Sequence, residues 1–247
     1  MASSKTTKPI LTFTIFLVAA GAATAILIHL WSPQRIALAN GRHAIENHIA
    51  EPADLTTYYG TPASRFDQIT AFPAWKAVPR GFQTFLNVPL QIDGMICLWG
   101  DGNAKMGLDF PTEVPGIEVN KKFETLYIYH ACFFTSPSGT PVYEVVFHYD
   151  DGSSLTNEIR YGVDVLDWYA NGKTVAAPTG PNSQVAWSGD SVSPGKTQRL
   201  RFCLTALENP QPNLKVTSLD LVSSKSRTAG CIMAMTPGKS GLMRSTK

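Results

Sequence analysis

Short runs of hydrophobic and β-branched residues recur from residue 81 onward, separated by turns rich in Gly, Pro, Asn and Asp. The pattern predicts strands at 82–88, 92–99, 116–119, 125–134, 142–149, 155–165, 184–188, 199–207, 215–222 and 230–236. No helix of useful length is expected between these strands. Strands that follow one another without helices exclude a parallel α/β sheet, so we expect an antiparallel β-sandwich or a barrel.

The segment 142–168 is the clearest single element of this pattern. Its two strand-forming runs flank the polar turn Asp150-Asp151-Gly152-Ser153, where the glycine is free to take a positive φ. Another dense strand, 126–134, comes directly before it. Together these runs predict an antiparallel sheet built around a hairpin.

The N-terminal residues follow a different pattern, because 10–31 are apolar and carry no formal charge unless His29 is protonated. A helix of that length crosses a bilayer core of roughly 30 Å, and Trp31 suits the membrane interface. We expect residues 10–31 to be a transmembrane anchor in the lipid bilayer, behind a short basic tail at 1–9. A cleaved signal sequence, with Ala37-Leu38-Ala39 as the cleavage pattern, and a buried core helix are the alternatives.

The rest of the chain divides by composition. Pro33 suits the start of a short helix and Pro52 stops it, so a stalk is expected beside the membrane. The stretch 54–80 is rich in turns yet too apolar for a disordered linker, and we expect it to pack on the sandwich. The expected organisation is tail 1–9, anchor 10–31, stalk 32–53, β-sandwich domain 54–237 and flexible tail 238–247.

Composition supports a folded domain and argues against a nucleic-acid partner. Hydrophobic residues make up 44% of the chain and charged residues 16%, which is enough apolar material for a core. The formal net charge is only +2 and the pI about 8.3. Lys and Arg are scattered along the sequence, so the basic stripe of a phosphate-binding surface is missing.

Four cysteines, Cys97, Cys132, Cys203 and Cys231, all lie in expected strands. None forms a CxxC pair, so neither a zinc ribbon nor a redox motif is supported. Small buried residues that fill the core are the favoured interpretation. In an exported domain one or two disulfides remain possible, with the pairing open.

Four stretches resemble a known family: FLNVPLQIDGMICLWG, GIEVNKKFETLYIYHACFF, YEVVFHYDDGSSLTNEIRYGVDVLDWY and LENPQPNLKVTSLDLVSS. Their order is similar to that in the galactose-binding-like jelly rolls of secreted or membrane-anchored bacterial proteins. The resemblance covers about 54–237 and is one of strands and corners, not of a catalytic fingerprint. It implies a jelly-roll sandwich, and family members are often sugar-binding or adhesive modules.

Carboxylates and tryptophans gather where the hairpin ends. Asp164, Asp167 and Trp168 follow it closely, and Asp190 follows Trp187. Carboxylates accept hydrogen bonds from sugar hydroxyls and indole rings stack on sugar rings, so these five residues are the candidate ligand site. The same aspartate-rich corners could bind Ca²⁺. The competing interpretation is that both tryptophans complete the core.

Two other kinds of site are consistent with the sequence. His130 and His148 have the same parity across an expected hairpin loop at 135–141, and with Asp150 or Asp151 they could begin a metal site, although structural histidines are commoner. No GxSxG, HExxH, Walker or dinucleotide motif is present, so no catalytic residue is assigned. A glycosidase pair of Asp150 or Asp151 with Asp167 is possible, but turn formation explains the first two better.

The sequence therefore predicts a membrane-anchored, extracytoplasmic and non-catalytic module that binds carbohydrate or another component of the cell envelope. The first alternative is a structural or protein-interaction domain at the membrane surface. The second is a β-sandwich glycoside hydrolase.

Overall fold

The computed structural model describes residues 33–64, 77–170, 176–193 and 196–243. The expected anchor at 10–31 lies outside these residues. Within the described part of the chain, no helix is both long enough and apolar enough to cross a membrane.

The described residues form two helices and a series of strands. The helices are α2 (Pro33–Glu46) and α3 (Asp101–Ala104). The strands are β1 (Thr61–Pro62), β2 (Gly81–Phe85), β3 (Val88–Ile92), β4 (Gly94–Cys97), β5 (Glu113–Lys121), β6 (Thr125–Phe133), β7 (Pro141–Tyr149), β8 (Ser154–Arg160), β9 (Tyr169–Ala170), β10 (Ser183–Ser193), β11 (Lys196–Glu208), β12 (Val216–Ser223) and β13 (Ala229–Gly238).

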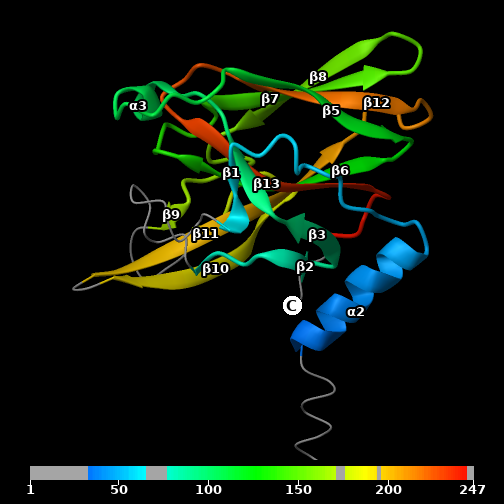
Figure 1. Ribbon diagram of the computed structural model, residues 1–247, viewed down its shortest axis with the longest axis horizontal. Coiled ribbons are helices and arrows are strands. Elements are labelled where there is room, and N and C mark those ends of the chain that lie inside the picture. The colour runs from blue at the N-terminus through cyan, green and yellow to red at the C-terminus, as the bar shows by residue number, and fades with distance from the viewer. Residues whose placement is uncertain (1–32, 65–76, 171–175, 194–195, 244–247) are drawn as a thin grey trace, which may run out of the picture.

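These strands form three antiparallel sheets. The largest has seven strands, in the order β1-β4-β13-β6-β11-β10 with β9 paired to β11. A four-stranded sheet has the order β5-β12-β7-β8, and β2 and β3 form a separate hairpin. Figure 1 shows the four-stranded sheet above the large sheet and the β2–β3 hairpin below it. The expected antiparallel β-sandwich is confirmed, and the hairpin adds a third layer.

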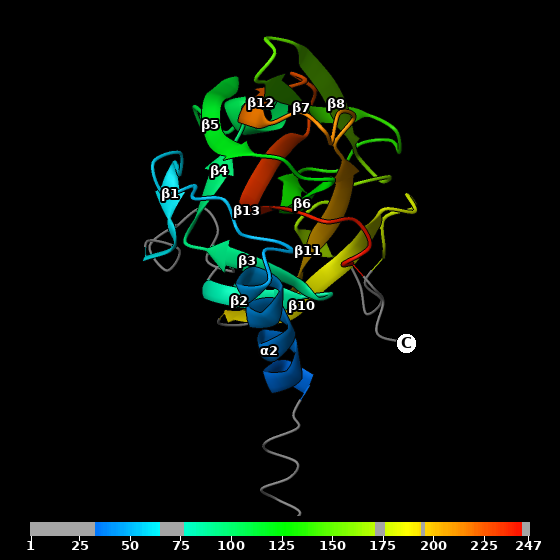
Figure 2. The same cartoon turned by 90° about the vertical axis from the view of Figure 1, so that its right-hand side faces the viewer.

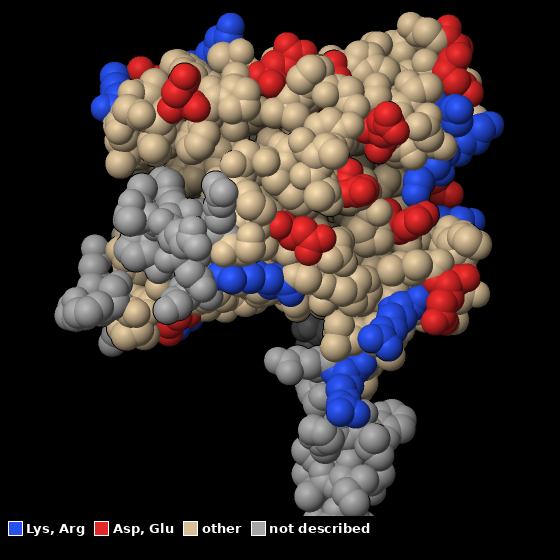
Figure 3. Space-filling model, in the orientation of Figure 1, with Lys and Arg blue, Asp and Glu red and all other residues tan. Residues whose placement is uncertain are grey.

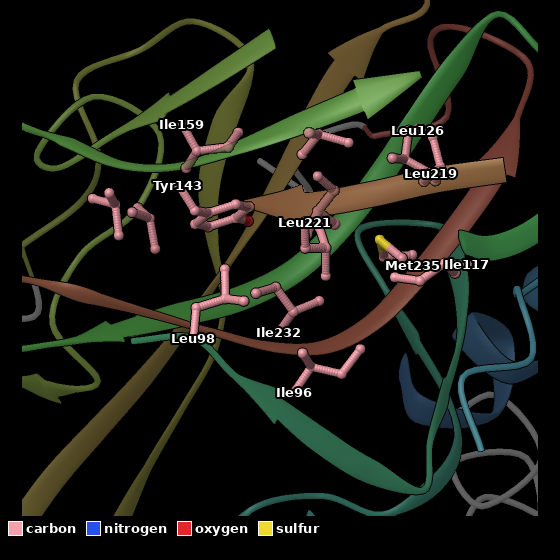
Figure 4. Packing of buried hydrophobic residues seen from close by; sticks show 14 of the residues in the cluster. Ile96, Leu98, Ile117, Leu126, Tyr143, Ile159, Leu219, Leu221, Ile232 and Met235 are labelled. Atoms are coloured by element: carbon pink, nitrogen blue, oxygen red, sulfur yellow. The ribbon is translucent and has the colours of Figure 1, made fainter. Parts of the chain in front are cut away.

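The central strands of the large sheet, β6 and β13, are buried on both faces. On one side its residues pack against the four-stranded sheet, in an inner core that includes Ile96, Ile232 and Leu219 (Figure 4). On the other side they pack against β3, in an outer core that includes Leu90 and Phe202. Every residue of β6 is buried, as expected for a strand whose two faces each meet a hydrophobic layer.

The predicted central hairpin forms as β7 and β8, with Gly152 at φ 86° in the turn. The strand expected at 82–88 instead turns at Leu86-Asn87, so that β2 and β3 form a hairpin. The strand expected at 92–99 is interrupted at Asp93: Ile92 ends β3 in the hairpin layer, and β4 belongs to the large sheet. β10 and β11 extend beyond the ranges expected for them. Their long pairing forms the ribbon at the lower edge of the molecule in Figure 1.

The short helix expected near Pro33 is α2, and it packs against the β2–β3 hairpin. Gly41 is buried at this contact, and a Cβ placed there would lie 2.1 Å from Oγ1 of Thr84. The absence of a side chain at Gly41 therefore allows the helix to approach the hairpin. From this contact α2 extends down and away from the sheets, with its N-terminal end outermost (Figure 2).

Candidate functional site

The aspartates that follow the central hairpin are engaged by their own backbone. Oδ2 of Asp164 accepts a hydrogen bond from the backbone N–H of Arg160 at 2.8 Å. Oδ1 of Asp167 accepts one from the N–H of Tyr169 at 3.0 Å. Both carboxylates thus fix the loop between β8 and β9, which is a structural use of Asp at turns.

Burial changes the acidity of both groups. It raises the pKa of Asp167 to about 6, although the N–H of Tyr169 and the charge of Arg201 favour the ionised form. Burial also raises the pKa of Asp164, against the hydrogen bond from Arg160. Burial therefore favours the protonated form of both carboxyls relative to solvated aspartates.

The two tryptophans are only partly exposed, and both pack on the outer core. Trp168 meets Phe133 edge to face, with ring centroids 6.5 Å apart. Trp187 lies 6.0 Å from Phe202 by the same measure. They reach β11 from opposite edges, because Trp168 leads into β9 while Trp187 lies on β10. Asp190 forms an ion pair with Arg199, so the five residues do not form one platform.

Trp187, unlike Trp168, lines a groove of about 580 Å³ between α2, the β2–β3 hairpin and β10. None of the described residues that line it is charged. They include three aromatic side chains and two side-chain amides. The lining residues are Ala37, Leu38, Pro79, Phe82, Gln83, Thr84, Phe85, Leu86, Asn87, Ala186 and Trp187.

Two of the aromatic side chains that line the groove pack on other aromatic rings of the outer core. Phe202 connects Trp187 to the buried Tyr129, whose ring centroid lies 5.3 Å from that of Phe202. Tyr129 in turn contacts Phe85, at 5.4 Å. On the strand itself, Gly189 leaves room for the indole, since a Cβ there would come within 2.4 Å of the Trp187 ring. The partly exposed rings of Trp187 and Phe85 are therefore held in position in the absence of a ligand.

The turn that joins β2 to β3 contributes a strained residue to the groove. Leu86 and Asn87 occupy the two loop positions with φ values of 51° and 67°. Asn tolerates this left-handed conformation, but for leucine it costs about 1–2 kcal/mol. Strain of this kind persists where the surroundings fix it, and it is concentrated at functional sites.

Polar groups in the groove are partly uncommitted. The amide nitrogen of Gln83 donates to the carbonyl of Arg80 at 2.7 Å, which leaves its oxygen as an acceptor. The hydroxyl of Thr84 has no hydrogen-bond partner, but it is buried against Gly41 of α2 and is not accessible to a ligand. Asn87 accepts only a long hydrogen bond, 3.5 Å, from Asn40. The groove can therefore offer both donors and acceptors to a neutral ligand.

The expected histidine pair does not form a metal site. His130 on β6 lies in the large sheet and His148 on β7 in the four-stranded sheet, because the connection at 135–141 crosses between sheets instead of closing a hairpin. His130 is bonded to Tyr143 and Thr205. His148 bonds Asp220 at 2.7 Å. No group of three or more potential His, Cys, Asp or Glu ligands gathers within the described ranges.

The turn aspartates have structural roles. Oδ1 of Asp151 accepts hydrogen bonds from the backbone and hydroxyl of Ser153. The backbone N–H of Asp150 donates a hydrogen bond to the carbonyl of Lys215. In return, Oδ1 of Asp150 accepts one from the backbone N–H of Lys215. These contacts close the β7–β8 turn and tie it to the start of β12.

The expected glycosidase pair is also separated. Tyr149, next to Asp150, bonds Asn209, which is tied to the residues before β6. The backbone of Asp167 forms an isolated β-bridge with that of Cys132, near the other end of β6. At about 3.3 Å per residue, these two anchoring points lie well beyond the roughly 5–10 Å between glycosidase carboxyls.

No known protein family, curated protein or solved structure matches this chain. Of the groove residues, sequence analysis singled out only Trp187 as a ligand residue. The others come from three segments that are far apart in the chain, so no local sequence motif identifies them. The one available signal was the pair Leu86-Asn87, where a two-residue turn places an apolar side chain in an unfavourable conformation.

Proposed function

We propose that this protein is a membrane-anchored, extracytoplasmic binding module of the galactose-binding-like jelly-roll type, and that it binds a neutral carbohydrate. The observation that supports this proposal is the uncharged groove, in which Trp187, Phe82 and Phe85 accompany the side-chain amides of Gln83 and Asn87. Small-molecule sites commonly combine aromatic surface with a few polar groups in this way.

The chemistry of the groove fits a sugar better than a charged ligand. A pyranose ring has an apolar CH face, which can lie on the fixed indole of Trp187. Its hydroxyls donate and accept hydrogen bonds, and they need partners of both kinds, which amides supply. An anionic lipid headgroup or a uronic acid would need a cation, and none is found among the described residues that line the groove.

The position of the groove supports a ligand near the membrane. α2, which forms one wall, directly follows the proposed anchor at 10–31 in sequence. The groove would then lie on the side of the domain closest to the bilayer. Figure 3 shows Lys and Arg side chains dispersed over the face that is turned to the viewer in Figure 1, with some on α2. This dispersal gives no support to a nucleic-acid partner.

Comparison of the two tryptophans tests the proposal. Trp187→Ala should weaken binding to a neutral glycan by about tenfold or more, because a stacking contact contributes about 1 kcal/mol beyond its buried area. Trp168→Ala is the matched control, since Trp168 packs on the same core but lies outside the groove. Binding is measured on a glycan array and by calorimetry, with thermal unfolding as the check on folding.

Equal loss of binding in both variants would overturn the assignment of the groove. Folded protein that binds no glycan, but that retains a defined envelope protein through purification, would instead support the protein-interaction alternative. Hydrolysis of a glycan that is abolished by Asp167→Asn would establish the glycosidase alternative.

A further inference from the structure

Two cysteines face each other on adjacent strands of the large sheet. Cys97 on β4 is directly opposite Cys231 on β13, and their Sγ atoms are 3.8 Å apart. The backbone N–H of Leu98 donates to the carbonyl of Gly230 at 2.9 Å. This hydrogen bond flanks the cysteines, so they occupy a non-hydrogen-bonded position of the antiparallel ladder.

Such positions suit a disulfide. Opposite Cα atoms at non-hydrogen-bonded positions are about 4.5 Å apart, which lies within the range of about 4.4–6.8 Å found for disulfides. Both sulfurs lie on the outer-core face of the sheet. Rotation of the two side chains could bring the sulfurs together without a change of strand register.

We propose that Cys97 and Cys231 are a disulfide-forming pair, closed by exchange with a small-molecule or protein disulfide. In the first step the thiolate of Cys97 attacks the oxidant, forms a mixed disulfide and releases one thiol. In the second step the thiolate of Cys231 attacks the Cys97 sulfur, forms the protein disulfide and releases the second thiol. The two cysteine thiols lose two electrons and two protons, and the oxidant's disulfide is reduced to two thiols.

Exposure determines the order of these steps. Cys97 is 6% exposed and Cys231 is fully buried, so the oxidant meets Cys97 first. Burial raises the pKa of the Cys231 thiol well above its usual range, which makes its thiolate scarce in the folded protein. Closure is therefore slow in the native state and faster during folding, before β13 is covered.

The other two cysteines are not positioned for this reaction. Cys132 and Cys203 lie in the inner core, on the opposite face of the same sheet. Cys203 is opposite His130, and Cys132 is opposite Gly230. Neither has a cysteine partner across the ladder. The pattern thus selects one of the pairings that the sequence left open.

The test is to refold the full chain in detergent with a mixture of oxidised and reduced glutathione. Intact mass should fall by about 2 Da, the two hydrogens lost in a disulfide, and non-reducing peptide mapping should join the Cys97 and Cys231 peptides. The Cys132→Ser/Cys203→Ser variant should behave like the wild type. Cys97→Ser and Cys231→Ser should each remain without an intramolecular disulfide.

Closure should also raise the melting temperature by roughly 5–15 °C relative to the reduced protein, because the bond links residues separated by 134 positions. An unchanged mass after refolding, or a linkage that involves Cys132 or Cys203, would overturn the proposal. The experiment uses no glycan, so its outcome is independent of the carbohydrate proposal. Formation of this disulfide in the cell would depend on the proposed extracytoplasmic location of the domain.

Discussion

At the residue scale, His130 joins the large sheet to the four-stranded sheet through a buried polar network. Its Nδ1 lies 2.6 Å from the hydroxyl of Tyr143 and its Nε2 lies 2.8 Å from the hydroxyl of Thr205. Thr205 also contacts Ser183 and donates to the carbonyl of Asp164. Every member has a partner, which is the condition under which a buried polar network stabilises a fold. Burial lowers the pKa of His130 to about 3.

The titrations of His130 and Asp167 should change the stability of the wild type in opposite directions, so that each hides the effect of the other. The neutral form of His130 is favoured by folding, so its contribution is complete above about pH 6.5 and is lost as the pH falls toward 3. Folding favours the protonated form of Asp167, so its contribution is present below about pH 3.8 and is lost as the pH rises through 6. Between pH 4 and 6 the two slopes have opposite signs.

Asp167→Asn should remove the contribution of Asp167 to the pH dependence of stability and leave that of His130. The stability of this variant relative to the wild type should rise by about 1 kcal/mol per pH unit from pH 4 to 6. Urea unfolding at several pH values measures the difference, in which the exposed carboxylates common to both proteins cancel. Parallel pH profiles for the two proteins would contradict this account of Asp167.

His130→Leu should lower the free energy of unfolding by about 2–4 kcal/mol, because it leaves the hydroxyls of Tyr143 and Thr205 buried with fewer partners. Denaturant unfolding at pH 7.5 measures this change. His148→Leu serves as the control, since His148 is partly exposed, and it should cost clearly less.

The histidines also show what a sequence can predict at this scale. Parity along a strand shows which residues share a face of that strand, and it led to the pairing of His130 with His148. Parity does not show whether the next strand continues the same sheet. A crossover and a hairpin have similar local patterns, and the difference is set by the hydrophobic residues on several distant strands.

At the scale of elements, the contact between α2 and the β2–β3 hairpin depends on a missing side chain. Gly41→Ala should improve helix propensity by about 1 kcal/mol, yet the new methyl group would overlap Thr84. We expect a net loss of stability of about 1–3 kcal/mol from this overpacking. Thr84→Ala should restore most of it, and a double-mutant cycle in urea measures the coupling. Additive effects would show that α2 does not seat closely on the hairpin.

The turn between β2 and β3 provides a second test at this scale. Leu86→Asn should leave the melting temperature unchanged or slightly higher, because Asn suits the left-handed region better than leucine. The same change removes an apolar residue from the groove, so glycan binding should weaken several-fold. A variant that is both stable and fully active in binding would exclude a role for Leu86 in the site.

Most strands were predictable because their alternation and turn residues agree, as in β7 and β8 with the turn at Gly152. The hairpin layer was not, because the strand expected at 82–88 turns at Leu86-Asn87, where the sequence has neither Gly nor Pro. Only the positions of the other layers decide that β3 and β4 belong to different sheets. The groove depends on that same decision, because β2 and the turn that joins it to β3 form its walls together with α2 and β10.

At the scale of the whole molecule, the large sheet is shared by both cores, so the layers should unfold together. Leu219→Ala, a change in the inner core, should cost about 2–5 kcal/mol. It should shift the unfolding midpoint by the same amount in far-UV circular dichroism and in tryptophan fluorescence, to which Trp168 and Trp187 on the outer core contribute. Separate midpoints for the two signals would show that the layers are independent.

The two-sided burial of β6 has a further consequence for how the protein can be made. Its nine residues carry no carboxylate, lysine or arginine, and every one is buried in the folded domain. An unfolded chain exposes this segment as a site for intermolecular β-pairing, flanked by the charges of Lys121, Lys122 and Glu124. Recovery of soluble protein should therefore fall as the concentration of unfolded chains rises, until β11 and β13 have paired with both edges of β6.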